Sequence, residues 1–392
     1  MYNILVIIGL MVLIPWAVWR LLRLESLVPL PMFQITVGIL FGPSVIGSYF
    51  PELWSGFFTD QVKTGLNAIQ ILAISIFAFI AGGELKLSEV IKEEGHSIWM
   101  QGIKVIAVPI VIASVLFWML FDSPVWHGDT RPFWQFAWSM GVATCITAMP
   151  MLVVALKQIG KWETPLGRKL LMLVTFDDLV LWLTVLFVIS LGTYAVKATI
   201  FFTVLAVLAY LWPKLLDKAG ESSWPALTVT MAMLLGYFSQ WAGLHFVLGA
   251  FLAGAITPRK ALFWNEGMDS QQMYWLMPVF FIWTGLRMSW ETSWGLIIGA
   301  AIFMYFISLI TKFIGVWLAY RQHGMNEVLF KTAMLQNKGL MEILLGTVML
   351  SAGLISNSMF SAIVVMSVIS TVTAVPLAKL FYKEEQPNEK TT

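Results

Sequence analysis

Two acidic residues, Asp177 and Asp178, stand side by side in the apolar stretch 171–187. A charged side chain at the centre of a bilayer costs roughly 3 to 10 kcal/mol or more, depending on how the cost is measured. Two acids there must therefore be hydrated, paired, protonated or bound to a cation. Because successive helix residues point about 100° apart, one carboxylate can face a water-filled cavity while the other faces a neighbouring helix. The pair predicts a site for which a proton and a hard metal cation compete.

Further polar residues lie in apolar segments and could complete this site. Lys312 is predicted either as a fixed counter-charge or as a lysine that pairs with one aspartate and releases it when a cation arrives. Lys338 precedes Glu342 by one helical turn, which favours a structural ion pair. Thr147, close to Pro150, could offer a hydroxyl or a freed carbonyl to the cation, and a core-packing threonine is the rival interpretation.

If one carboxylate binds either a proton or a cation, and the site opens to each side of the membrane in turn, the protein exchanges the two ions. The residues therefore predict an antiporter. We expect a Na⁺/H⁺ antiporter, with a K⁺/H⁺ antiporter of the same fold as the alternative, because Na⁺ and K⁺ both take oxygen ligands and the residues do not separate them. A gated cation channel without proton coupling is an alternative from another class. An intramembrane aspartyl protease is disfavoured, because its two acids would face each other from two helices, whereas these are adjacent on one.

Composition identifies a polytopic membrane protein. The chain has 392 residues, 59% of them hydrophobic and 12% charged, against about 25% charged in ordinary soluble domains. The net charge of +2 is too small to indicate nucleic-acid binding. With the single Cys145, neither a disulfide framework nor a cysteine metal site is available. We expect no cofactor beyond the transported ions, and membrane lipids as surroundings.

Apolar segments of about 20 residues predict about 13 transmembrane helices. They are expected at residues 2–20, 29–50, 63–84, 96–121, 133–158, 166–192, 196–213, 223–241, 243–258, 270–286, 293–320, 328–353 and 358–382. Lysine and arginine gather in alternate connections, so the positive-inside rule places the N-terminus outside and the C-terminus in the cytoplasm. The membrane domain would cover residues 1–382, and residues 383–392 would form a short cytoplasmic tail.

Two of these helices carry interruptions. Pro150 breaks the first, and Gly339, next to three polar residues, weakens the second. Matching interruptions indicate inverted repeats whose broken helices cross at the binding site. The halves would be residues 1–192 and 223–382, linked by a helix at 196–213.

Seven stretches, in order, resemble the monovalent cation:proton antiporter 2 family, which includes the bacterial Kef-type and NapA-like exchangers. They are Ile39-Leu-Phe-Gly-Pro-Ser-Val-Ile-Gly47, Phe79-Ile-Ala-Gly-Gly-Glu-Leu-Lys-Leu87, Thr147-Ala-Met-Pro150, Phe176-Asp-Asp-Leu179, Gly249-Ala-Phe-Leu-Ala-Gly254, Pro278-Val-Phe-Phe-Ile-Trp-Thr-Gly-Leu286 and Asn337-Lys-Gly-Leu-Met-Glu342. The resemblance covers nearly the whole membrane chain.

The resemblance implies a homodimer in a bacterial or archaeal inner membrane. It implies transport helices within residues 96–192 and 293–382 that move against dimerisation helices within 2–84 and 223–286. It further implies that Asp178 is the principal carboxylate for Na⁺ or K⁺ and for the proton, and that Asp177 pairs with Lys312, the pattern of electrogenic exchange. Lys338 stands where the family has an arginine, and we expect no Kef-type regulatory domain after the membrane helices.

Overall fold

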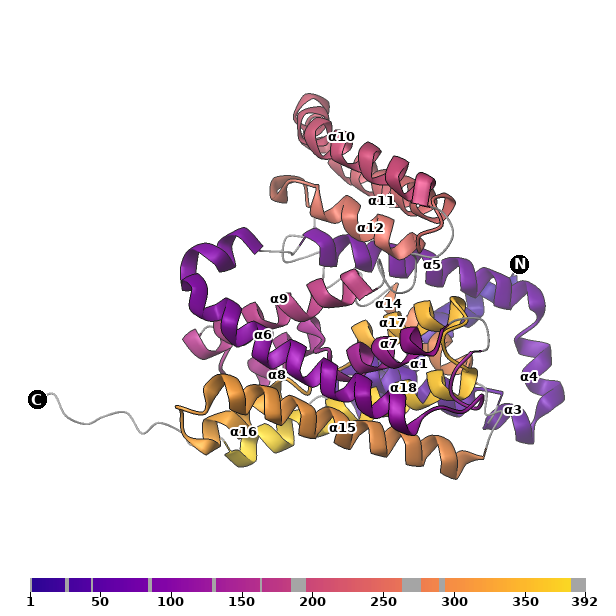
Figure 1. Cartoon of the computed structure of the whole chain (residues 1–392). Coiled ribbons are helices and arrows are strands. Elements are labelled where there is room, and N and C mark those ends of the chain that lie inside the picture. The colour runs from indigo at the N-terminus through magenta and orange to yellow at the C-terminus, as the bar shows by residue number, and fades with distance from the viewer. Residues whose placement is uncertain are drawn as a thin grey trace, which may run out of the picture.

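A computed structural model describes residues 2–24, 28–43, 45–83, 87–128, 132–162, 164–184, 195–262, 276–288 and 293–381. All regular elements in these ranges are helices (Figure 1). The α-helices are α1 (Tyr2–Leu21), α2 (Leu30–Phe41), α3 (Ile46–Tyr49), α4 (Pro51–Phe57), α5 (Asp60–Gly83), α6 (Leu87–Leu120), α7 (Phe133–Cys145), α8 (Met149–Gln158), α9 (Pro165–Thr184), α10 (Ala195–Ala219), α11 (Trp224–Trp241), α12 (Phe246–Ala255), α14 (Met277–Leu286), α15 (Trp294–Tyr320), α16 (Met325–Met334), α17 (Leu340–Ser351) and α18 (Asn357–Phe381).

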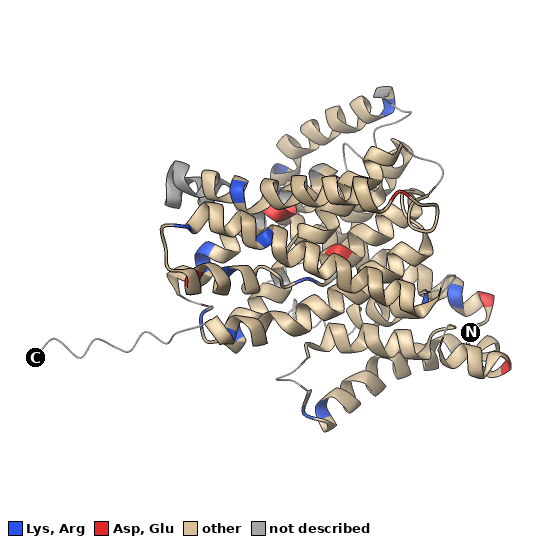
Figure 2. Ribbon diagram, turned by 60° about the horizontal axis from the view of Figure 1, so that its bottom comes forward, with Lys and Arg blue, Asp and Glu red and all other residues tan. Residues whose placement is uncertain are grey.

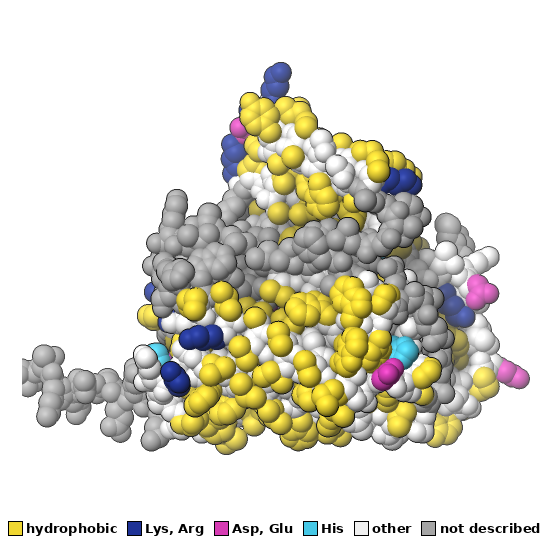
Figure 3. Space-filling model, viewed as in Figure 1, with side chains coloured by type: hydrophobic (Ala, Val, Ile, Leu, Met, Phe, Trp, Pro, Cys, Tyr) yellow, Lys and Arg dark blue, Asp and Glu magenta, His cyan; other side chains and the backbone are white. Residues whose placement is uncertain are grey.

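The helices suit a lipid environment. Among the described residues, seven helical segments are long and apolar enough to cross a membrane, and three shorter apolar helices accompany them. Figure 2 shows charged positions mainly at helix ends and in connections, with few inside the body. Figure 3 shows hydrophobic side chains spread over the visible outer face. The all-helical membrane fold is thus confirmed, while the count of about 13 crossings stays a prediction.

The single helix expected at 29–50 is wrong. The helix α2 ends at Phe41, and Gly42 takes an extended backbone with ψ of 168°. Pro43 explains this ending, because it cannot donate a helical hydrogen bond and forces the preceding residue out of the helical region. The chain then forms the two short helices α3 and α4. The expected segments 185–192 and 270–275 lie outside the described residues.

Helix packing divides the described helices into two groups. One group contains α1, α2, α5, α10, α11, α12 and α14, and the other contains α6, α7, α8, α9, α15, α16, α17 and α18. Extensive backbone packing occurs within each group, and α2 packs more sparsely against α18 across the boundary. Figure 1 shows α10, α11 and α12 stacked at one edge and α15 with α16 at the opposite edge. The predicted scaffold and transport helices fall in different groups, although their roles stay predictions.

The two expected interruptions are present. The first separates α7 from α8 at residues 146–148, and the second separates α16 from α17 at residues 335–339. Gly339 ends the second break with a φ of 153°, in a region that residues with a side chain rarely adopt. A Cβ at this position would also lie 2.8 Å from Cγ of Met151 on α8. This glycine therefore lets the two interrupted segments approach each other.

The stretch Gly249–Gly254 serves packing within the chain. A Cβ on Gly249 would overlap the carbonyl of Leu235 on α11, and one on Gly254 would overlap the carbonyl of Phe79 on α5. Small residues allow such close approach between helix backbones. This part of α12 is therefore occupied by its own chain's helices.

We expect Gly339→Ala to destabilise the protein by about 1–3 kcal/mol, because alanine disfavours this φ and its Cβ meets Met151. Thermal unfolding of the purified protein in detergent measures the loss. Gly299→Ala in α15 is the matched control, because a Cβ there meets nothing within 4 Å and alanine favours the helix. Equal unfolding temperatures for the two variants would contradict the role of Gly339.

Candidate functional site

The two interrupted segments are joined directly where they cross. The backbone N–H of Ala148 donates to the carbonyl of Asn337 at 2.8 Å. The hydroxyl of Thr147 donates to the carbonyl of Leu335, also at 2.8 Å. These bonds satisfy backbone groups that the breaks release from helical bonding, which is required where water is scarce.

Two buried lysines bind consecutive carbonyls of the first break. Nζ of Lys312, on α15, donates to the carbonyl of Cys145 at 2.6 Å. Nζ of Lys338, in the second break, donates to the carbonyl of Ile146 at 2.8 Å. Their side chains are only 1% exposed. Because the C-terminal end of a helix carries partial negative charge, the end of α7 is a favourable place for two ammonium groups.

Asp177 connects α9 to this arrangement. Its Oδ2 accepts hydrogen bonds from Nζ of Lys312 and from the backbone N–H of Thr147, both at 3.2 Å. Thr147 lies two residues before the start of α8, close to the helix end whose partial positive charge favours a carboxylate. The other carboxylate oxygen, Oδ1, receives no hydrogen bond from the residues that the structure describes. It therefore retains lone pairs that could bind a cation or a proton.

Asp178 follows on the same helix and is 6% exposed. As the next residue on a helix, its Cβ projects about 100° away from that of Asp177. Since the side chain of Asp177 meets the crossing, that of Asp178 leaves α9 in another direction. The described residues contain no cluster of three His, Cys, Asp or Glu side chains that could hold a metal. An ion at the two aspartates would therefore complete its shell with water or other oxygens.

Glu342 caps a half-helix more closely than it pairs with a lysine. Its Oε2 accepts the backbone N–H of Gly339 at 2.6 Å, at the start of α17. Its Oε1 lies 3.7 Å from Nζ of Lys338, longer than the bond from that lysine to Ile146. The i,i+4 spacing thus indicates a real proximity, but it does not reveal the stronger contact that Lys338 makes across the crossing.

Hydroxyl groups bind further carbonyls of the second break. Ser370 donates to the carbonyl of Gln336 at 3.0 Å, and Thr371 donates to that of Lys338 at 2.6 Å. Ser308 donates to the side-chain amide of Gln336 at 2.9 Å. The sequence reasoning missed these residues. Their signal was present as serines and threonines inside two apolar segments, where hydroxyls commonly bond between helices.

These bonds bear on how Thr147 could serve a cation. Its side chain is fully buried and its hydroxyl proton is directed to Leu335, so only the oxygen lone pairs remain for an ion. The carbonyls of Cys145 and Ile146, which the break frees, are already taken by the two lysines. In this conformation the aspartate oxygens are the better cation ligands.

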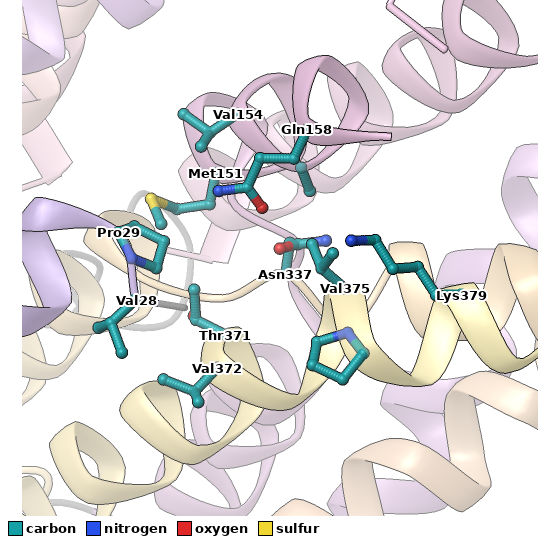
Figure 4. A pocket seen from close by; sticks show the side chains of 12 residues that line it. Val28, Pro29, Met151, Val154, Gln158, Asn337, Thr371, Val372, Val375 and Lys379 are labelled. Carbon is teal, nitrogen blue, oxygen red and sulfur yellow. The ribbon is translucent and has the colours of Figure 1, made fainter. Parts of the chain in front are cut away.

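A cavity of about 340 Å³ reaches the crossing from beside α18 (Figure 4). Met151, at the start of α8, and Asn337, in the second break, line its inner part. Neither Asp177 nor Asp178 lines it. The cavity therefore ends at the second break and does not extend to the aspartates.

Comparison with known proteins identifies the family. Residues 8–380 match the transmembrane domain of sodium/hydrogen exchangers. The chain belongs to this family. The match covers both interruptions, the two aspartates and both lysines, so the crossing described above lies entirely inside the family's domain.

Several curated proteins are similar to this chain. The Na⁺/H⁺ antiporter NhaS4 of Synechocystis is 26% identical over 97% of this chain and 96% of its own length. The probable Na⁺/H⁺ antiporter GerT of Bacillus cereus is 24% identical, covering 90% of this chain and 93% of its own. The K⁺/H⁺ antiporter 1 of Saccharomyces cerevisiae is 27% identical, but the match covers only 44% of its length.

The fold also resembles a solved structure. The sodium proton antiporter MjNhaP1 of Methanocaldococcus jannaschii superimposes with a TM-score of 0.62, covering 96% of this chain and 97% of that one. The sequence identity is 15%, so this likeness concerns the arrangement of helices alone.

We expect Lys312→Met to lower the unfolding temperature strongly, because it leaves the buried Asp177 without its ammonium partner. Adding Asp177→Asn should recover much of the loss. A double-mutant cycle measured by thermal unfolding should give a coupling of about 2–5 kcal/mol, as for other buried charge pairs.

The pair of Lys331 and Glu327 provides the control cycle. These side chains lie 2.6 Å apart, but Glu327 is 40% exposed, and partly exposed pairs couple by about 1 kcal/mol or less. A coupling between Lys312 and Asp177 no larger than that of the control pair would refute the proposed electrostatic link.

Proposed function

We propose that this protein exchanges Na⁺ for protons by alternating access, with Asp178 and Asp177 as the shared ion and proton site. The observation that carries the proposal is the buried pair of aspartates on α9 beside two crossing interruptions. Family membership and the names of the antiporters to which the chain is similar support it. Lys312 supplies the counter-charge to Asp177.

The balance of buried charge supports competition at this site. Three carboxyl groups (Asp177, Asp178 and Glu342) and two ammonium groups (Lys312 and Lys338) surround the crossing, all at most 6% exposed. If all of them are ionised, one net negative charge remains. One monovalent cation or one proton neutralises it. Binding a cation and a proton together would leave a net positive charge, which the protein interior disfavours. This balance gives one proton for one cation, which is electroneutral, so the electrogenic exchange that the resemblance implies would need a second group to change its protonation state.

The two helix groups support alternating access. His245 directly precedes α12, and Ser351 is the last residue of α17. Nε2 of His245 lies 3.3 Å from Oγ of Ser351 and so joins the two groups. The rings of Trp182 on α9 and Phe251 on α12 also stack across the groups, with centroids 4.0 Å apart. These contacts join the two groups and would have to break if one group moves against the other.

The identity of the cation is the least constrained part of the proposal. The relatives matched along their whole length carry Na⁺/H⁺ names, whereas the yeast relative named for K⁺/H⁺ exchange is matched over less than half its length. This favours Na⁺ and keeps K⁺ as the alternative. We further propose, from the sequence resemblance, the Kef-type and NapA-like branch, a homodimer, and a prokaryotic inner membrane with the N-terminus outside.

Asp178→Asn should abolish Na⁺-driven proton movement, because the amide can neither take up a proton nor balance a cation. Proteoliposomes with an internal pH dye, challenged in turn with Na⁺, K⁺ and Li⁺, measure the exchange. Asp217→Asn is the control, because Asp217 is exposed on α10. Normal proton flux in Asp178→Asn would refute the assigned site, and cation flux without proton movement in the wild type would indicate a channel.

A covalent bridge between residues 245 and 351 should stop exchange. We suggest His245→Cys with Ser351→Cys in a Cys145→Ser background, linked by mercuric ion or a short thiol-specific bridge. If the two helix groups move relative to each other, exchange should fall at least tenfold and, for the mercuric bridge, return when an excess of a competing thiol removes the ion. The two single-cysteine proteins are the controls, and undiminished exchange in the fully bridged protein would exclude this movement.

A further inference from the structure

The cavity beside α18 changes in character from its rim to its inner end. Gln158, at the end of α8, and Lys379, near the end of α18, are exposed at the rim. Asn337 and Thr371, at the inner end, are 2% and 3% exposed. The hollow therefore has polar side chains both at the surface and at the second break.

The other walls of the hollow are mainly apolar. One wall comes from the residues before α2, and the others come from α8 and α18. The wall residues are Val28, Pro29, Val154, Val372 and Val375. A pocket with an apolar body and a polar mouth matches an amphiphile better than a small hydrated ion.

The charge of the pocket is unsuited to a cation. Among the described residues that line it, Lys379 alone has an ionisable side chain, and no carboxylate faces the space. Figure 4 shows Lys379 and Asn337 reaching toward each other from α18 and the second break, with nitrogen atoms at the facing ends. Nδ2 of Asn337 donates one hydrogen to the carbonyl of Met334 and retains another. Two donors that face each other suit an anionic oxygen placed between them.

We propose that this pocket binds an anionic phospholipid, with an acyl chain along the valine-lined walls and the phosphate at Lys379. The exposed apolar side chains on the outside of the helices put membrane lipid next to the protein. Burial of its methylene groups favours insertion of the acyl chain, and the ammonium group of Lys379 favours a negatively charged headgroup. The site contains neither aspartate, so it is separate from the proposed ion site.

Native mass spectrometry of the full chain in detergent tests this proposal, with dioleoyl phosphatidylglycerol, dioleoyl phosphatidylcholine and inorganic phosphate as probes. The wild type should bind phosphatidylglycerol more tightly than phosphatidylcholine. Lys379→Gln should weaken phosphatidylglycerol binding roughly fivefold, the contribution expected of one lysine near a membrane surface. Lys218→Gln is the matched control, because Lys218 is exposed in the last turn of α10 and does not line the pocket.

A second variant fills the pocket. Val372→Trp should remove the binding of phosphatidylglycerol. If thermal unfolding shows that this variant is not folded, Val154→Trp fills the same space from α8. Equal binding of the two lipids by the wild type would overturn the proposal. So would equal effects of Lys379→Gln and Lys218→Gln, or undiminished binding in the filled pocket. Phosphate that competes as well as the lipid would indicate an anion site without an acyl chain, and would also refute it.

Discussion

Two interrupted backbones that cross in a medium poor in water are the constraint on which the rest of this structure depends. Each break creates half-helix ends with partial charge, and the buried ionic groups lie at those ends. Lys312 and Lys338 lie at the end of α7, Asp177 at the start of α8 and Glu342 at the start of α17. Charges that would be costly in isolation therefore compensate the dipoles that the breaks expose.

Lys312 has both a structural contact and a contact with the candidate ion site, so the two roles are not alternatives. Lys312 holds the carbonyl of Cys145 and also contacts Asp177. A group that satisfied only the backbone would leave the aspartate uncompensated, and one that satisfied only the aspartate would leave the break exposed. Because both bonds come from one ammonium group, the integrity of the crossing and the charge of the site are linked.

The sequence predicted the two helix breaks. It did not predict the long-range hydrogen bonds that satisfy the backbone groups freed by those breaks. Pro150 and Gly339 revealed both breaks, because each is unfavourable in a helix interior whatever surrounds it. The contact from Lys338 to Ile146 joins residues 192 positions apart, and helical spacing reports only local pairs such as Lys338 with Glu342. Pro43 carried the same kind of signal, and applying the proline rule there would have divided the segment 29–50.

The two bonds of Lys312 also suggest how the site can change its charge without coming apart. If Asp177 binds a proton or shares a cation, as proposed, its attraction for the ammonium group weakens. Lys312 then still donates to Cys145 at 2.6 Å, and the crossing keeps its backbone bond from Ala148 to Asn337. The lysine is thus never left buried without an acceptor, so neutralising the carboxylate costs less than breaking an isolated buried pair. Exchange at a single site requires that the backbone bonds of the crossing persist while the charge of the carboxylate changes.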